Sequence, residues 1–159
     1  MEIERIEVRK SERTLTAHCH GGGRLEFSIA LSRESGPKRE RGDLRTPEGD
    51  YRIAAQGRRS RFHRFIPIDY PSLADAEVAL AEGRISVAER DAIALAHRHG
   101  RLPPQDTALG GHLGFHGEGE RWQGDLDLDW TEGCFALADA AIDLLASRAP
   151  PGTPVHILP

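Results

Sequence analysis

The chain has 159 residues and a mass of 17.5 kDa, a size that fits one domain with a core large enough to need no disulfide framework. Hydrophobic residues make up 38% and charged residues 29% of the sequence, which is typical of a globular protein and excludes a disordered chain. The 25 acidic residues outnumber the 21 basic ones, and the net charge of −4 argues against a nucleic-acid-binding domain. No apolar run reaches the roughly 18 residues that a membrane-spanning helix needs.

The N-terminal segment MEIERIEVRK alternates charged and apolar residues and contains no apolar core of a signal peptide. Either the protein acts where it is made, or a leader has been removed from this sequence. The two cysteines, Cys19 and Cys134, are compatible with one bridge or with two free thiols.

No repeat or linker divides the sequence, so we expect a single domain over residues 1–159. In the first third, short alternating runs at 3–8, 14–17 and 25–29 predict strands joined by tight turns. The polar stretch 35–43 predicts an exposed loop, and 49–54 resumes as a strand.

The middle of the chain predicts helices over 72–80 and from Ser86 to Gly100, because Ser86 and Glu89 fit a capping box. A strand over 112–116, a helix over 138–148 and a last strand over 155–158 follow. This order predicts a mainly β fold with attached helices, in the α+β class.

Cys134 follows Gly133 where a loop is expected to lead into the helix over 138–148. Backbone amides at a helix N-terminus lower the pKa of a thiol and stabilise an oxyanion, and a glycine lets a substrate carbonyl approach the backbone. These features predict a nucleophilic cysteine. The alternative interpretation is a buried, inert cysteine beneath the helix.

His116 lies 18 positions before Cys134. On a strand over 112–116, His112, Gly114 and His116 share one face, while the apolar residues between them point into the core. A thiol nucleophile needs a base, and histidine is the usual one. Taken alone, His116 would be an incidental member of the 8 histidines; its pairing with Cys134 is what suggests a catalytic role.

Three segments resemble the motifs of the L,D-transpeptidase (YkuD-type) catalytic domain. GDLRTPEGDYRI at 42–53 is similar to the family's G-D-x-x-T-P-x-G-x-Y-x-I, and GHLGFHG at 111–117 is similar to its strand ending in His-Gly. TEGC at 131–134 stands where the family has S/T-x-G-C. The motifs occur in the family's order, and the resemblance covers nearly the whole chain.

The resemblance implies a mixed β-sandwich whose cysteine attacks the carbonyl of the third residue of a peptidoglycan stem peptide. Terminal D-alanine leaves, and an amine acceptor or water takes the acyl group from the thioester. It implies Cys134 as nucleophile, His116 as base and the Gly117 carbonyl as the group that orients the imidazole. The amides around Gly133 and Cys134 would form the oxyanion hole, and no metal or organic cofactor is implied.

Other residues expected around the substrate are Thr131, Glu132, His112 and Arg45. Many family members read S-H-G-C-x-R, whereas here Glu132 replaces the second histidine and Ala136 replaces the arginine. Glu132 either accepts a hydrogen bond from a substrate ammonium or is simply solvated. The form D-W-T-x-G-C-x-A-L resembles a branch that includes enzymes releasing lipoprotein from peptidoglycan, which leaves transfer and hydrolysis both open.

The basic clusters 38–41 and 58–61 are expected to be solvated loops. The functional alternative is that Arg45, Arg61 or Arg64 holds a stem-peptide carboxylate by forked hydrogen bonds. Trp122 and Trp130 would either anchor a loop or line a peptide groove.

The leading hypothesis is therefore an L,D-transpeptidase-like acyltransferase, with a protein or peptide amine as acceptor and no nucleic-acid partner. A hydrolase using the same site (an L,D-carboxypeptidase or peptidoglycan–protein amidase) and an inert cell-wall binding module are the alternatives. We expect a monomer in the periplasm or cell envelope, with the cytoplasm as the other open compartment.

Overall fold

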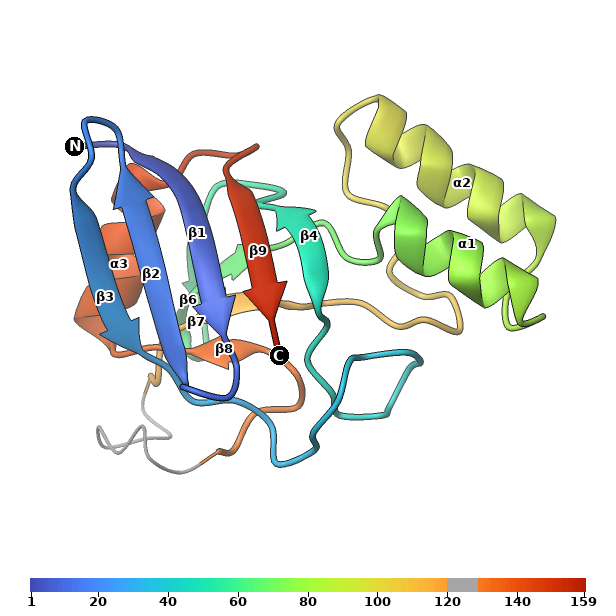
Figure 1. Ribbon diagram of the computed structural model, residues 1–159, viewed down its shortest axis with the longest axis horizontal. Helices are drawn as coiled ribbons and strands as arrows, with labels where there is room; N and C mark the ends of the chain where they lie inside the picture. Colours follow the sequence, from blue (N-terminus) through green and yellow to red (C-terminus); the bar gives the residue numbers. More distant parts are fainter. Residues whose placement is uncertain (120–128) are drawn as a thin grey trace.

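The computed structural model describes residues 1–119 and 129–159 and contains two β-sheets (Figure 1). The larger sheet has the strand order β3-β2-β1-β9-β4. Strand β9 pairs in parallel with β1 and antiparallel with β4, so the end of the chain is inserted between two earlier strands. The strands are β1 (Ile3–Arg9), β2 (Thr14–Cys19), β3 (Arg24–Ser28), β4 (Gly49–Arg52) and β9 (Pro154–Leu158).

The smaller sheet has the order β5-β6-β7-β8. Its central pair is antiparallel, whereas β7 and β8 run parallel, with Phe115 opposite Phe135 and His116 opposite Ala136. The strands are β5 (Arg58–Ser60), β6 (His63–Pro67), β7 (Gly114–His116) and β8 (Phe135–Ala136).

The core is built from the inward-facing residues of both sheets. Val8, on β1, and Phe115 and Phe135, on the smaller sheet, are fully buried, and the two phenyl rings stack with centroids 4.9 Å apart. Helix α3 (Asp139–Arg148) packs on β6 and β7 and buries Ile142 and Leu145. This packing fixes β6 and β7 against the helix.

Helices α1 (Leu73–Ala81) and α2 (Val87–Arg98) form a hairpin between β6 and β7, which lies to one side of the sheets beyond β4 (Figure 1). Each begins with a capping box, Ser72 with Asp75 and Ser86 with Glu89. The Tyr51 hydroxyl donates to Asp75 at 2.7 Å and ties the hairpin to β4. None of the helices within the described ranges has the length and apolar character needed to cross a bilayer.

The α+β class predicted from the sequence is confirmed, as are the three helices and the strands of the larger sheet. The strand predicted over 112–116 begins only at Gly114, because His112 has a φ of 59°, outside the extended region. The segment 58–61, predicted as a solvated loop, instead contributes the exposed strand β5. Trp122 lies outside the described residues.

Candidate active site

Cys134 and His116 line the same cavity, which has a volume of about 310 Å³. The cavity walls come from the β5–β6 turn, the segment leading into β7 and the loop before β8. Other lining residues are Ser60, Arg61, Phe62, Phe65, Gly111, His112, Leu113, Trp130, Thr131 and Glu132. Of the residues expected around the substrate, His112, Thr131 and Glu132 are therefore brought together with Cys134 and His116.

The parallel pairing of β7 and β8 explains why two residues 18 positions apart line one cavity. His116 ends β7, Cys134 immediately precedes β8, and the His116 carbonyl accepts a hydrogen bond from the Leu137 amide at 2.9 Å. Gly114 permits the close pairing with β6, since a Cβ there would lie 2.2 Å from the Ile66 carbonyl oxygen.

The imidazole of His116 is held in one tautomer. Its Nδ1 atom lies 2.7 Å from the Gly117 carbonyl oxygen, and because a carbonyl only accepts, Nδ1 carries the proton. Nε2 is therefore the basic nitrogen. Only glycine fits at position 117, where a Cβ would lie 2.4 Å from Asp139 Oδ1.

Asp139, in the first turn of α3, holds the segment after Gly117. Its Oδ1 accepts hydrogen bonds from the amides of Glu118 at 2.8 Å and Gly119 at 3.2 Å. Sequence reasoning missed this residue, because an acid at the start of a helix is common and nothing local shows which loop it caps.

Phe62 and Trp130 enclose the imidazole. Phe62 stacks on His116 with ring centroids 4.7 Å apart, and Trp130 lies 5.5 Å from the imidazole and 5.3 Å from Phe62. Burial lowers the pKa of His116 and the positive charge of Arg61 lowers it further, while the bond to Gly117 opposes both. The resting imidazole is therefore neutral near pH 7 and able to accept a proton. Trp130 thus lines the cavity, and Phe62 is a site residue that the sequence analysis did not single out.

Cys134 is half-buried, and its Sγ donates a hydrogen bond to the His112 carbonyl oxygen at 3.6 Å. Burial raises the pKa of the Cys134 thiol to about 11, with a smaller contribution from the charge of Glu132, while a backbone hydrogen bond from Gly114 acts in the opposite direction. The prediction that a helix N-terminus lowers this pKa is wrong. Strand β8 separates Cys134 from α3, which begins only at Asp139. The N-terminal amides of the helix therefore do not belong to the segment that carries the thiol.

The loop that carries Cys134 is held by two threonines. Thr131 Oγ1 donates to the Cys134 carbonyl at 2.8 Å, and Thr46 Oγ1 donates to the Gly133 carbonyl at 2.9 Å. Gly133 has a φ of 127°, and a Cβ there would lie 2.8 Å from the Arg45 carbonyl oxygen, so the position requires glycine.

The two amides expected to form the oxyanion hole, those of Gly133 and Cys134, differ in their hydrogen bonding. The Gly133 amide donates to Thr131 Oγ1 at 3.3 Å, within its own loop. The hydrogen bonds found among the described residues include none from the Cys134 amide. Of the two amides, that of Cys134 is the one available to a substrate oxygen.

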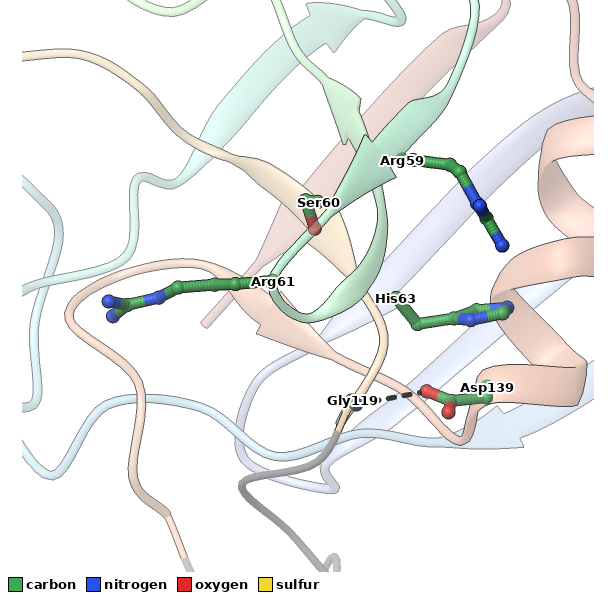
Figure 2. Close-up of a pocket in the computed structure, with 6 residues that line it drawn as sticks. All are labelled: Arg59, Ser60, Arg61, His63, Gly119 and Asp139. Atoms are coloured by element: carbon green, nitrogen blue, oxygen red, sulfur yellow. Dashed lines mark hydrogen bonds between the residues drawn. The ribbon is translucent and has the colours of Figure 1, made fainter.

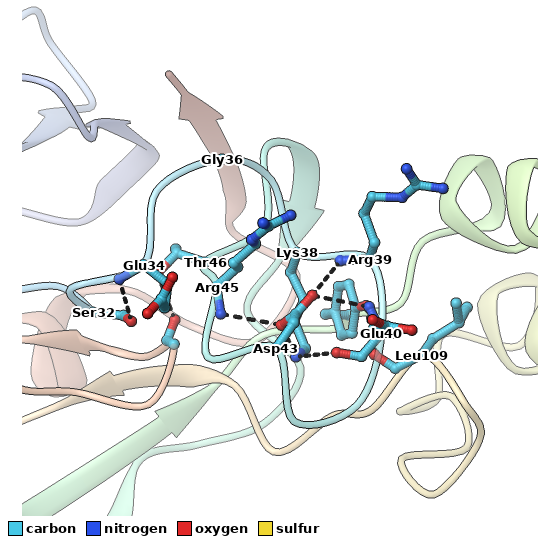
Figure 3. Close-up of polar contacts among 12 residues, drawn as sticks. Ser32, Glu34, Gly36, Lys38, Arg39, Glu40, Asp43, Arg45, Thr46 and Leu109 are labelled. Atoms are coloured by element: carbon cyan, nitrogen blue, oxygen red, sulfur yellow. Dashed lines mark hydrogen bonds and ion pairs between the residues drawn. The ribbon is translucent and has the colours of Figure 1, made fainter.

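The loop before β4 contains a buried ion pair (Figure 3), and the Lys38 amide donates a hydrogen bond to the Thr46 carbonyl at 3.2 Å. Lys38 Nζ lies 2.9 Å from Asp43 Oδ1, and the two side chains are only 5% and 9% exposed. Asp43 also accepts hydrogen bonds from the amides of Arg39, Glu40 and Arg45. Burial alone would raise the pKa of Asp43, but these donors hold it at about 2. The Asp43 of the first motif therefore has a structural role, because its carboxylate holds the loop that contains it.

The three candidate arginines lie in different surroundings. Arg45 lines a separate cavity with Glu34, Arg39 and Arg84, so its side chain is not brought to Cys134. Arg64 is paired with Asp143, its Nε 3.0 Å from Oδ1. Arg61 lines the cavity of Cys134 and His116.

Comparison with known proteins decides the family. The family model described as the L,D-transpeptidase catalytic domain (YkuD) matches residues 3–157. The chain belongs to this family. No curated protein gives a significant sequence match.

Solved structures share the fold of this L,D-transpeptidase-family domain at low identity. It is similar to the helical cell shape determining protein Pgp2 from Campylobacter jejuni, with a TM-score of 0.65, 19% identity, and coverage of 98% of this chain and 47% of that chain. It is also similar to an L,D-transpeptidase mutant from Enterococcus faecium, with a TM-score of 0.59, 15% identity, and coverage of 99% and 50%. The domain thus spans about half the length of these structures.

Proposed function

We propose that this L,D-transpeptidase-family domain is a cysteine acyltransferase acting on peptidoglycan stem peptides, with Cys134 as nucleophile and His116 as base. The observation that carries the proposal is the shared cavity, which is lined by both a half-buried thiol and a neutral imidazole of fixed tautomer. The match of the family model to residues 3–157 supports the substrate class.

Acylation begins with a neutral pair. A thiol with a pKa of about 11 is almost fully protonated at pH 7, so the proton leaves during attack and not beforehand. The Sγ proton passes to His116 Nε2 as sulfur bonds to the scissile carbonyl carbon. The oxyanion that forms accepts a hydrogen bond from the Cys134 amide.

Collapse of this intermediate breaks the C–N bond, and His116 returns the proton to the leaving amine. A thioester on Cys134 and a free terminal residue result. An amine acceptor then attacks the thioester and gives its proton to His116, which restores the thiol. If water attacks instead, the same steps give a carboxypeptidase or an amidase.

Incubation with muropeptides that carry tetrapeptide stems, followed by mass spectrometry, tests the proposal. Crosslinked dimers formed with loss of the terminal residue support transfer, and loss of that residue alone supports hydrolysis at the same site. Unchanged muropeptides, together with undiminished binding of peptidoglycan by Cys134→Ala, would favour a binding module.

The substrate places the proposed site of action in the cell envelope, and the periplasm in an organism with an outer membrane. The domain contributes the acyl-transfer site; no metal or organic cofactor enters these steps.

A further inference from the structure

Arg61 is the one arginine or lysine among the described residues that line the cavity of Cys134 and His116. It is exposed, and its Cζ lies 4.6 Å from the centroid of the Phe62 ring, the same ring that stacks on His116. The hydrogen bonds and ion pairs found in the described parts of the chain do not engage its guanidinium. A cation is therefore held beside the base and left open to a ligand.

The neighbouring cations are directed elsewhere. Ser60 and Arg61 also border a second cavity of about 730 Å³, whose other lining residues include Arg59, His63 and Asp139. Figure 2 shows Arg61 extending away from Arg59 and His63, which lie toward α3. Arg61 thus stands at the boundary of the two cavities and lines both, whereas Arg59 and His63 line only the second.

The position of the family's motif arginine cannot supply this charge. Ala136 occupies that position on β8 and is fully buried against the core. Glu132, which lines the catalytic cavity from the loop before β8, is exposed and negative. The cavity therefore carries a positive charge from the β5–β6 turn and a negative charge from the cysteine loop, so a substrate carboxylate is attracted to Arg61 and repelled by Glu132.

We propose that Arg61 binds the terminal carboxylate of the donor stem peptide, on the leaving-group side of the scissile bond. The inference rests on the function proposed above. In a stem with one residue after the scissile bond, the carboxylate is two bonds from the nitrogen that His116 protonates. The guanidinium lies over the Phe62 ring that stacks on His116, which places it on the side of this imidazole, and its planar donors match a carboxylate in a forked geometry.

As a consequence, Arg61 would select donor stem peptides by their length and by their C-terminal group. Stems with a single free-carboxylate residue after the scissile bond satisfy Arg61, whereas stems with a further residue or a carboxamide leave it without its partner. Arg61 is then a specificity-determining residue that supplies, from the β5–β6 turn, the positive charge that Ala136 does not provide on β8.

Binding to a Cys134→Ala variant tests this without turnover. Calorimetry would compare a stem tetrapeptide ending in a free carboxylate with the same peptide ending in a carboxamide. We expect the free acid to bind about tenfold tighter, a typical effect of one charge-assisted hydrogen bond. Adding Arg61→Gln should abolish this preference, and Arg61→Lys should retain part of it.

Arg59→Gln is the matched control, because Arg59 is an exposed arginine two residues away that points into the other cavity. In the Cys134→Ala background it should leave the carboxylate preference intact. A preference that survives Arg61→Gln, or that Arg59→Gln removes equally, would overturn the assignment of Arg61 and leave the proposed function standing. Failure of both peptides to bind at all would overturn both.

Discussion

The Nδ1 atom of His116 lies 2.7 Å from the carbonyl oxygen of Gly117, the next residue in the chain. This contact turns Nε2 into the proton acceptor and depends on the backbone of 117–119, which Asp139 holds through two amides. The orientation of the proposed base therefore depends on a carboxylate at the start of α3.

Replacement of Asp139 by alanine should lower kcat by about tenfold, because a shift in the Gly117 carbonyl misorients the imidazole. The thiol itself is untouched, so the total count of reactive cysteines should not change. Steady-state kinetics on a stem tetrapeptide would measure the effect.

Asp143→Ala is the matched control for Asp139, since Asp143 lies one turn further along α3 and pairs at the surface with His63 and Arg64. Its loss should change kcat by less than twofold. Equal losses of kcat in the two variants would show that the helix, and not the Gly117 contact, is what matters.

The pH dependence of kcat/KM should reflect the buried base. Burial, assisted by Arg61, lowers the pKa of His116 from its ordinary 6.5, so the neutral form persists and activity should fall on the acid side only below pH 6.5. Arg61→Gln removes the repulsion between two cations, so the imidazolium becomes easier to form and the acid limb should move to higher pH. An acid limb that moves to lower pH, or that Arg59→Gln moves as far, would contradict this coupling.

Thiol reactivity should show that Cys134 depends on His116. At pH 7.5 a thiol of pKa about 11 is thiolate in fewer than about one molecule in a thousand, so rapid alkylation requires the base. In the wild type, Cys134 should be labelled faster than Cys19, which is 4% exposed in the core. His116→Ala should slow the labelling of Cys134, whereas His63→Ala, which removes a histidine bound to Asp143, should not.

Peptide mapping after limited iodoacetamide treatment would measure these rates. Faster modification of Cys19 in the wild type would argue strongly against the proposed nucleophile.

The order of the longer strands and helices could be predicted from the sequence, because each of them has a local sequence pattern. The alternation in β1 to β3 and the capping box at Ser86 act locally, and both predictions agree with the structure. Strands β5 and β8 are three and two residues long, and β5 is exposed throughout, so neither shows a period that a sequence can reveal.

The residues His116 and Cys134 could be predicted from sequence motifs, but the pKa values and supporting contacts of the candidate site could not. The motifs predicted one site for His116 and Cys134, and the two residues line one cavity because β7, which ends at His116, pairs with β8, which follows Cys134. The raised pKa of Cys134, the role of Asp139 and the stacking by Phe62 arise from packing between distant segments, which no local pattern encodes.

Acid sensitivity should follow from the Asp43 carboxylate, which the amides of Arg39 and Glu40 and the Lys38 ammonium stabilise in its charged form. The pKa of Asp43 is about 2 in the folded protein against its ordinary 3.8, so this carboxylate stabilises the fold above pH 3.8, and that contribution is lost as the pH falls toward 2. The difference corresponds to about 2 kcal/mol. Urea unfolding at pH 7 should show Asp43→Asn destabilised by roughly this amount, because Lys38 is left buried without its partner.

Asp91→Asn is the control for Asp43, since Asp91 forms an exposed pair with Arg90. Its free energy of unfolding should change by less than about 0.5 kcal/mol. If the two variants unfold at the same urea concentration, the buried pair does not stabilise the loop that supports Thr46.

Capture of the acyl-enzyme tests the nucleophile most directly. The wild-type protein would be mixed with a stem tetrapeptide, quenched in acid and analysed by intact mass and peptide mapping. We predict an adduct on Cys134 equal to the donor peptide minus its terminal residue, present in wild type and absent in Cys134→Ala. Release of the terminal residue by Cys134→Ala at the wild-type rate, or an adduct on another residue, would contradict it.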